Sequence, residues 1–317
     1  MFKVVKTDGM LLTEAEQLQQ FDGLDVEFVE VTCLTEQALI DACADADAVL
    51  ALREPFTANV IQALPRCKII SRFGVGLDSI DVPAATAAGI RVANVPDSNF
   101  DEVSTHALAM LLALLRRLPQ YDAAVRAGKW DALGGGVGIR RPSHMTLGLV
   151  GFGRIGQDFA RKAAAVGFKV CAYDPHMPAS VFEGAGVQQV PFEGLLDSVD
   201  VISLHVPLTD STASLLDAKA LARLRKGSYV INVSRGGLID EHALAAALAS
   251  GHIAGAGIDT LASEPPQHDN PLLSQSGLLL SPHAAHYSEQ SYAEVRTKAF
   301  ASVAAVLRGE EPLYPVN

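Results

Sequence analysis

The segment Leu147–Asp174, LGLVGFGRIGQDFARKAAAVGFKVCAYD, carries the strongest structural signal in this chain. It opens with the apolar run Leu147–Val150, which predicts a short buried strand, and glycines follow in G-x-G-x-x-G spacing. A helical stretch, Arg154–Val166, and a second apolar run then lead to Asp174. A strand, a glycine turn, a helix, a second strand and an acid in this order predict a dinucleotide-binding βαβ unit.

Three glycines and one acid define the expected ligand. Gly151 is expected to make the tight turn, Gly153 to let a pyrophosphate approach the backbone, and Gly156 to let helix and strand pack closely. The free N–H groups at the start of the helix would bind the phosphates. Asp174, 23 residues after Gly151, is placed to bond the ribose hydroxyls, and its charge would repel a 2′-phosphate. The predicted cofactor is therefore NAD; a glycine-rich turn without a ligand is the weaker interpretation.

Composition and charge limit the possible partners. With 317 residues, of which 49% are hydrophobic and 19% charged, the chain is long enough for about two domains. The net charge of −11 argues against nucleic acid and anionic membrane as partners, and no apolar run approaches the roughly 20 residues of a membrane span. Four cysteines without metal spacing are expected to be free thiols, and the N-terminus lacks a signal-peptide core. We therefore expect a cytoplasmic protein without a metal site.

Short strands and helices alternate along the chain, which predicts parallel sheets covered by helices on both faces. The predicted fold class is α/β with two doubly wound parallel-sheet domains. A Rossmann dinucleotide-binding domain of residues 98–285 is inserted into a flavodoxin-like substrate domain of residues 1–97 and 286–317. Strands are expected near 2–5, 26–31, 48–51, 69–71 and 91–95, and near 147–150, 168–173, 200–204, 229–233, 255–258 and 278–281.

A long helix is predicted over 101–118, between the two alternating regions. Its residues 107–115 are apolar almost all round, so this part must be buried between domains or against a second subunit. We expect a homodimer through this helix. The segment 134–144 is predicted to be a flexible loop, in which Arg140, Arg141 and His144 are solvated.

Three polar side chains follow the ends of three predicted strands. Arg235 comes after the strand near Val233, Glu264 lies five residues after Asp259, and His283 follows the last strand. Ligands of an open parallel sheet bind outside the carboxyl ends of its strands. One guanidinium, one carboxylate and one imidazole are therefore predicted to converge on the edge that the glycine turn also faces.

These residue types fit hydride exchange between a hydroxyl-bearing carbon and a nicotinamide. The reaction needs a group that takes the hydroxyl proton and returns it in reverse, and histidine titrates near neutral pH. Glu264 would fix the tautomer of His283 and favour its imidazolium form. Arg235 would polarise the carbonyl and hold a carboxylate through paired bonds. The cofactor carries the hydride chemistry, so no metal is required.

Six segments in this order resemble the D-2-hydroxyacid dehydrogenase family, which is NAD-dependent and specific for the D isomer. The resemblance covers essentially the full length. The segments are Arg72–Asp81 (RFGVGLDSID), Gly148–Gly156 (GLVGFGRIG), Leu204–Leu216 (LHVPLTDSTASLL), Val230–Glu241 (VINVSRGGLIDE), Gly257–Pro266 (GIDTLASEPP) and Ser281–Glu289 (SPHAAHYSE).

The resemblance implies a role for each matched position. Arg235, Glu264 and His283 stand at the positions of the family's catalytic arginine, glutamate and histidine. The backbone amides of Val75 and Gly76 would take the substrate carboxylate. Cofactor-binding roles are expected for Gly151, Gly153, Arg154, Ile155, Gly156, Asp174, Pro207, Thr212, Val233, Ser234 and Asp259, and substrate-binding roles for Arg53, Arg72, Val75, Gly76 and His286.

Within the family, residues 101–115 and 283–290 are similar to the branch that contains the C-terminal-binding proteins. That branch commonly has tryptophan where this chain has His286, which leaves the substrate preference open. Formate dehydrogenases of the superfamily use glutamine in place of the glutamate, so Glu264 argues against formate. The end of the chain at Asn317 is expected to leave no room for an appended regulatory domain.

The resulting hypothesis is an NAD-dependent oxidoreductase that interconverts a small 2-keto acid and its D-2-hydroxy acid. One alternative is an NAD(H)-sensing binding protein with vestigial catalysis. Another is a methyl transferase that uses the glycine turn for S-adenosylmethionine, but it explains neither Arg235 nor His283. Of the remaining histidines, His205 is interpreted as structural or cofactor-side, and His106 is expected to have no chemical role.

Overall fold

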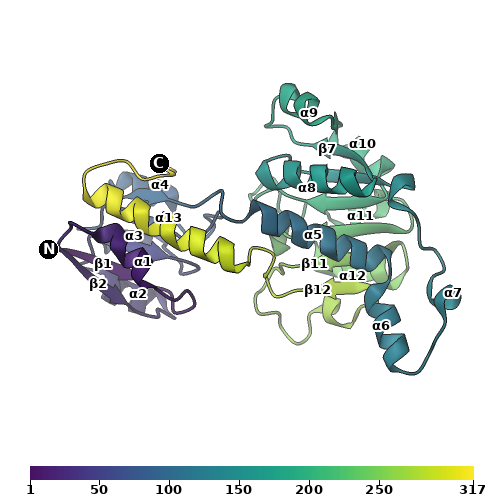
Figure 1. Ribbon diagram of the computed structural model, residues 1–317, viewed down its shortest axis with the longest axis horizontal. Helices are drawn as coiled ribbons and strands as arrows, with labels where there is room; N and C mark the ends of the chain where they lie inside the picture. Colours follow the sequence, from purple (N-terminus) through teal and green to yellow (C-terminus); the bar gives the residue numbers. More distant parts are fainter. The chain divides into compact units, whose positions relative to one another are not determined.

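The computed structural model describes every residue from Met1 to Asn317, and the chain divides into two compact units (Figure 1). Unit 1 consists of Met1–Asn99 and Tyr287–Asn317, and unit 2 consists of Phe100–His286. Each unit is built on its own parallel sheet, with five strands in unit 1 and seven in unit 2. The predicted fold class is therefore confirmed. No helix of the chain combines the length and the apolar character that a bilayer span requires.

Unit 1 has the flavodoxin-like strand order β2-β1-β3-β4-β5. Its strands are β1 (Phe2–Lys6), β2 (Val26–Glu30), β3 (Ala48–Ala51), β4 (Ile69–Arg72) and β5 (Arg91–Ala93), and its helices are α1 (Ala15–Leu18), η1 (Gln19–Phe21), α2 (Glu36–Cys43), α3 (Ala58–Gln62), α4 (Val82–Ala87) and α13 (Glu289–Leu307). All four residues of the central strand β3 are buried, because helices cover both faces of the sheet.

The last helix, α13, completes one face of the sheet of unit 1. Ser288 caps its first turn, with its side chain accepting the N–H of Ser291. Phe300 is fully buried and packs with the apolar side chains of β3 and β4. Ser71 of β4 donates a hydrogen bond to the carbonyl of Ala299 at 3.1 Å. The segment after residue 286 is thus an integral part of the core of unit 1.

Unit 2 has the strand order β12-β11-β10-β9-β6-β7-β8, which is the Rossmann order 3-2-1-4-5-6 with one further strand at the end. Its strands are β6 (Thr146–Val150), β7 (Lys169–Tyr173), β8 (Gln188–Gln189), β9 (Val201–Leu204), β10 (Ser228–Asn232), β11 (Ile253–Ile258) and β12 (Leu278–Leu280), and its helices are α5 (Phe100–Leu115), α6 (Leu118–Arg126), α7 (Ala132–Gly135), η2 (Pro142–His144), α8 (Arg154–Val166), α9 (Ala179–Ala185), α10 (Phe192–Ser198), α11 (Ala218–Arg223), η3 (Gly236–Leu238), α12 (Glu241–Ala249) and η4 (Pro271–Ser274). Apolar residues of α5 and α8 cover one face of the sheet, and those of α10, α11 and α12 cover the other.

The edge strand β8 was not predicted, because its two exposed glutamines carry no apolar pattern.

The helix predicted over 101–118 is wrong at its C-terminal end. α5 ends at Leu115, Arg117 takes a left-handed conformation with φ of 53°, and α6 begins at Leu118. Pro119 explains the break, because it has no N–H to donate to the carbonyl of Leu115 and its ring would clash with that carbonyl. The buried face of α5 packs against α8, β10 and β11 of its own unit, so its burial requires no second subunit.

The prediction of a loop over 134–144 is wrong in part, although Arg140, Arg141 and His144 are exposed as expected. The segment contains the end of α7 and the turn η2. Arg140 Nη1 lies 2.7 Å from Oδ1 of the buried Asp200, and Asp200 Oδ2 accepts the N–H of Thr146 at 2.8 Å. This ion pair fixes the end of the segment to the first residue of β6.

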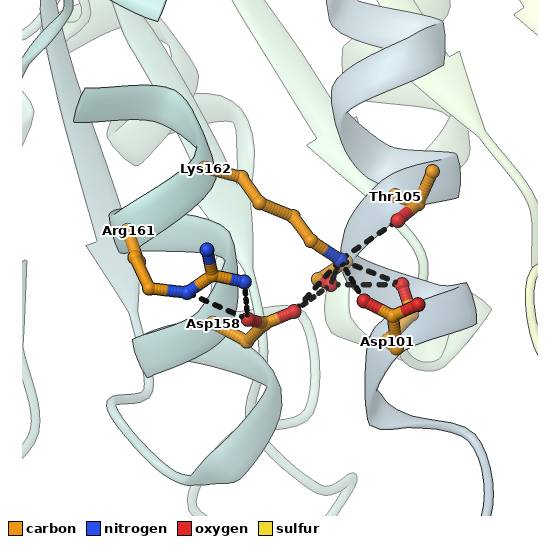
Figure 2. Close-up of polar contacts among 6 residues, drawn as sticks. Asp101, Thr105, Asp158, Arg161 and Lys162 are labelled. Carbon is orange, nitrogen blue, oxygen red and sulfur yellow. Dashed lines mark hydrogen bonds and ion pairs between the residues drawn. The ribbon is translucent and has the colours of Figure 1, made fainter. Parts of the chain in front are cut away.

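Lys162 of α8 ties this helix to the first two turns of α5 (Figure 2). Its ammonium group lies 2.6 Å from Asp101 Oδ1 and 2.7 Å from Thr105 Oγ1 of α5, and 2.8 Å from Asp158 Oδ2 of α8. It also donates to Ser104 Oγ at 2.6 Å. Because the lysine side chain is only 15% exposed, these bonds are partly shielded from water and hold the start of α5 against α8.

Candidate active site

The glycine-rich turn joins β6 to α8 at the carboxyl end of β6. Gly151 has a φ of +96°, and a Cβ there would lie 2.5 Å from the carbonyl oxygen of His205, so only glycine fits. A Cβ on Gly156 would lie 2.4 Å from the carbonyl oxygen of Gly151. Beside Gly153, the N-cap of α8, no atom other than those of its chain neighbours and of its own helix lies within 4 Å of the Cβ position. This open space and the N–H groups of the first turn of α8 form a cradle that fits a phosphate group.

Asp174 follows β7 and lies beside the glycine turn. Its Oδ2 accepts the N–H of Phe152 at 2.8 Å, and its Oδ1 accepts the N–H of His176 at 2.9 Å. The two bonds fix the carboxylate next to the turn, where it suits ribose hydroxyls and opposes a 2′-phosphate. Arg154 is exposed and Ile155 is partly buried in the first turn of α8.

The sheet of unit 2 reverses its strand order between β6 and β9, so the loop after β9 lies at the switch point. Thr212 Oγ1 donates to the carbonyl of Pro207 at 2.7 Å and accepts the N–H of Thr209 at 2.8 Å, which places all three in one turn. His205, the first residue after β9, bonds Ser203 Oγ through Nε2 at 2.9 Å. Burial lowers the pKa of His205 to about 3. This partly buried imidazole is therefore neutral.

Arg235 follows β10 in a turn that Asn232 fixes. The buried side chain of Asn232 accepts the N–H of Ser234 at 3.0 Å through Oδ1 and donates from Nδ2 to the carbonyl of Arg235 at 2.8 Å. A Cβ on Gly236 would lie 1.9 Å from the carbonyl carbon of Leu261, so glycine is required here as well. The turn that carries Arg235 is thus in direct contact with the loop after β11.

Glu264 and His283 meet at the carboxyl ends of β11 and β12. Glu264 Oε2 lies 2.7 Å from His283 Nδ1, and Glu264 Oε1 accepts the N–H of Leu261 at 3.1 Å. The side chains of Glu264 and His283 are 30% and 29% exposed, so a small molecule can reach them. Because Nδ1 is bonded to Glu264, Nε2 is the ring nitrogen that remains for proton exchange.

The loop that carries His283 wraps around Asp259, the residue after β11. The buried Asp259 carboxylate accepts the N–H groups of Ala284 at 2.9 Å and Ala285 at 3.0 Å, and the hydroxyl of Ser281. Its backbone carbonyl accepts the N–H of His283 at 2.7 Å. These bonds hold His283 at a φ of +54°, which is costly for a residue with a Cβ. The Asp259 side chain anchors this loop, and its expected place on the nicotinamide side stays a prediction.

His286 lies beside this pair. The ring centroids of His283 and His286 are 5.8 Å apart in an edge-on arrangement. The structure thus brings Glu264, His283 and His286 together, while Arg235 approaches the same edge of the sheet from β10, whose neighbour is β11. Val233 is buried at the end of β10, and Ser234 Oγ donates to the carbonyl of the last residue of β9 at 2.8 Å.

The predicted substrate-binding residues of unit 1 lie at the carboxyl ends of its strands. Arg53 follows β3, and Arg72 ends β4 with its Nε donating to a backbone carbonyl after β3 at 3.2 Å. The loop with Val75 and Gly76 is held by Asn94, whose Nδ2 donates to the carbonyl of Val75 at 2.7 Å. Unit 1 therefore presents two guanidinium groups and this loop at one edge of its own sheet.

Sequence reasoning missed three residues that support the site: Asn232, Ser281 and His106. His106 Nε2 lies 2.9 Å from Ser281 Oγ, although no chemical role was expected for this histidine. Asn232 could have been noticed as a polar residue that ends an apolar strand. The contact of His106 with Ser281 had no signal, because it joins residues 175 positions apart.

Comparison with known proteins gives a consistent picture. Residues 108–285, all in unit 2, match the model of the "D-isomer specific 2-hydroxyacid dehydrogenase, NAD binding domain" family. A D-3-phosphoglycerate dehydrogenase of Mycobacterium leprae is 41% identical over 91% of this chain and 54% of its own length. A glyoxylate reductase of Korarchaeum cryptofilum is 37% identical over 89% of this chain and 86% of its own. A D-lactate dehydrogenase of Aquifex aeolicus, solved with NAD and lactic acid, is similar with a TM-score of 0.88 and 26% identity over 99% of this chain and 98% of its own.

The relatives differ in length from this chain. It spans about half the length of the D-3-phosphoglycerate dehydrogenases that it matches. It covers 86% of the glyoxylate reductase and 98% of the D-lactate dehydrogenase. The similarity therefore includes both units of this chain, but not the remainder of the longer relatives.

Proposed function

The chain belongs to the family of D-isomer-specific 2-hydroxyacid dehydrogenases, and on this basis we propose that it transfers a hydride between NAD(H) and a small 2-keto acid or its D-2-hydroxy acid. The observation that carries the proposal is the 2.7 Å contact of Glu264 Oε2 with His283 Nδ1 at the carboxyl edge of a Rossmann sheet. It supplies an acid–base group whose ring orientation is fixed. NAD(H) supplies or accepts the hydride when bound.

The three catalytic side chains have separate roles in this proposal. His283 donates a proton from Nε2 to the C2 oxygen during reduction and takes it back during oxidation. Glu264 fixes the tautomer of His283 and stabilises the imidazolium form. Arg235 holds the substrate carboxylate and polarises the C2 carbonyl, which its planar guanidinium can do through paired bonds. The backbone amides of Val75 and Gly76 are also proposed to take the substrate carboxylate, and Arg53, Arg72 and His286 are proposed to contact the rest of the substrate.

The proposed cofactor site follows the β6–β9 half of the carboxyl edge. The open space beside Gly153 and the fixed carboxylate of Asp174 support it. Arg154 and Ile155 would lie beside the phosphates and ribose, and Pro207 and Thr212 on the adenine and phosphate side. Val233, Ser234 and Asp259 would lie on the nicotinamide side.

A panel of 2-keto acids tests the proposal. NADH oxidation is followed by absorbance with glyoxylate, hydroxypyruvate, its phosphate ester and larger 2-keto acids. At least one of them should be reduced, and where the product is chiral only its D isomer should be oxidised in reverse. Tight NADH binding without turnover on any substrate would instead favour an NAD(H)-sensing protein.

We also propose a homodimer, formed through the arm 118–137 rather than through α5. Figure 1 shows α6 and α7 extending away from the sheet of unit 2. Trp130, Leu133 and Val137 of this arm are 90%, 87% and 71% exposed, and such large apolar side chains are normally covered. Light scattering at micromolar concentration should give the mass of two chains, and Leu133→Asp should give the mass of one. A monomeric wild-type protein would contradict the proposal.

A cytoplasmic location is proposed from the cysteines. All four are free, and burial raises the pKa of the thiols of Cys43 and Cys67 to about 12. Free buried thiols are typical of a reducing compartment. Cell fractionation should recover the protein with cytoplasmic markers.

A further inference from the structure

His106 contacts the loop that carries the acid–base histidine, although it lies on a different element. It belongs to α5, and its Nε2 is 2.9 Å from Ser281 Oγ and 3.7 Å from Asp259 Oδ1. Ser281 is two residues before His283, and its hydroxyl bonds Asp259 Oδ1. A chain of polar contacts therefore runs from α5 to the carboxylate around which the His283 loop wraps.

The direction of these hydrogen bonds follows from the donor inventory. An ionised carboxylate only accepts, so the single proton of the Ser281 hydroxyl points to Asp259. Ser281 Oγ must then accept from His106, which places a proton on His106 Nε2. Asp259 thus sets the tautomer of His106. His106 in return fixes the Ser281 hydroxyl in the orientation that donates to Asp259 Oδ1.

We propose that His106 is a positioning residue for His283, acting through Ser281 and Asp259; the proposal rests on the catalytic role proposed for His283. The carboxylate of Asp259 holds the N–H groups of Ala284 and Ala285, and its carbonyl holds that of His283. Together these bonds keep His283 in its left-handed conformation with Nδ1 on Glu264. Loss of the donor at position 106 frees the Ser281 hydroxyl and loosens the loop.

Kinetics with four variants test this chain of contacts: His106→Ala, His106→Gln, Ser281→Ala and the double variant of the two alanine changes. His106→Ala should lower kcat by about fivefold to tenfold, the range expected for one hydrogen bond, with NADH affinity within about twofold. His106→Gln should recover most of the loss, because its side-chain amide can donate to Ser281. The double variant His106→Ala/Ser281→Ala should have a kcat within about twofold of the lower of the two single-variant values. Both changes break the same connection, so their effects should not add.

A matched control comes from the opposite edge of the sheet. His252 precedes β11 and bonds the carbonyl of Leu221 at 3.1 Å through Nε2. His252→Ala removes an imidazole with a similar hydrogen bond, and it should leave kcat unchanged. Wild-type kcat in His106→Ala, no recovery in His106→Gln, or fully multiplicative losses in the double variant would each overturn the proposal.

A spectroscopic measurement separates this inference from the proposed function. The low-field proton resonance of the His283 ring bonded to Glu264 is assigned as the one that His283→Ala removes. It should be broadened or shifted in His106→Ala and restored in His106→Gln. An unchanged resonance in His106→Ala refutes the positioning role, whether or not the wild-type protein reduces any 2-keto acid. If the resonance changes in His106→Ala while the wild-type protein reduces no 2-keto acid, only the proposed activity is refuted.

Discussion

The carboxyl edge of the sheet of unit 2 has two halves that differ in how they present polar groups. From β6 to β9 the edge is built from glycines and backbone N–H groups, and its histidine, His205, is partly buried with its pKa lowered by loss of solvent to about 3. From β10 to β12 the edge presents side chains, and its histidine, His283, is partly exposed beside Glu264. Both histidines follow a strand and both are partly buried, so the partner carboxylate of His283 and the desolvation of His205 separate an acid–base group from a neutral one.

This difference fits the chemistry proposed for each half. Phosphates and ribose require close backbone approach and a few fixed acceptors, which a glycine turn and Asp174 provide. Proton transfer requires a side chain that exchanges protons near neutral pH and reaches the substrate. Substitutions in the β10–β12 half should therefore change turnover, while those in the β6–β9 half should change cofactor selection or stability.

The largest effect is expected at His283. The variant His283→Ala should lower keto-acid reduction by roughly a hundredfold or more, because it removes the general acid. Its NADH affinity, measured by fluorescence titration, should remain near that of the wild type. If turnover of His283→Ala stays within tenfold of the wild type, the β10–β12 half does not carry the acid–base chemistry and the proposed difference between the two halves is wrong.

A smaller effect is expected at Arg235. The variant Arg235→Ala should both lower kcat and raise KM for the 2-keto acid, since charge-assisted bonds contribute roughly 1.5–3 kcal/mol. The combined loss in kcat/KM should be about 10-fold to 150-fold in steady-state assays. Arg235→Lys, which keeps the charge but not the paired geometry, should recover only part of it. Complete recovery by lysine would contradict the bidentate role.

Asp174 should control selectivity rather than rate. The variant Asp174→Ala should reduce the preference for NADH over NADPH by about tenfold, the effect of removing one charge near the ribose that is worth roughly 1.4 kcal/mol. The value of kcat with saturating NADH should change little. Unchanged selectivity between the two cofactors would mean that Asp174 does not lie at the ribose.

The smallest effect on turnover is expected at His205. The variant His205→Gln should keep kcat within about threefold, because burial already holds the imidazole neutral. In the wild type the unfolded chain binds a proton at position 205 below its ordinary pKa of 6.5, while the folded chain does not. The free energy of unfolding should therefore fall with decreasing pH below 6.5, by up to about 1.4 kcal/mol per pH unit from this residue. Urea unfolding at pH 7.5 and 5.5 checks this, and equal pH dependence in variant and wild type would contradict it.

The sequence was sufficient to predict both parallel sheets and the elements around Leu147–Asp174. Strand periodicity, the glycine spacing and the caps are local signals, and local signals are readable from a single chain. The end of α5 was wrong because a run of apolar residues outweighed Pro119, two residues after the left-handed Arg117. The edge strand β8 was missed because it is short and polar.

The site was only partly predictable for a different reason. Strand order brings Glu264 to His283, so their contact follows from topology. The Asp259 anchor, the Asn232 turn and the His106 contact depend on side-chain directions and distances, which spacing along the chain does not determine. The burial of His205 is likewise a tertiary property, since its position after a strand resembles that of His283.

A crystal structure of the protein with NADH and an unreactive 2-keto acid analogue such as oxamate tests the proposed site most directly. His283 Nε2 and the guanidinium of Arg235 should both lie within hydrogen-bond distance of the analogue, with C4 of the nicotinamide facing its carbonyl carbon. An analogue bound away from these two side chains, or a nicotinamide ring turned from them, would contradict the proposed mechanism.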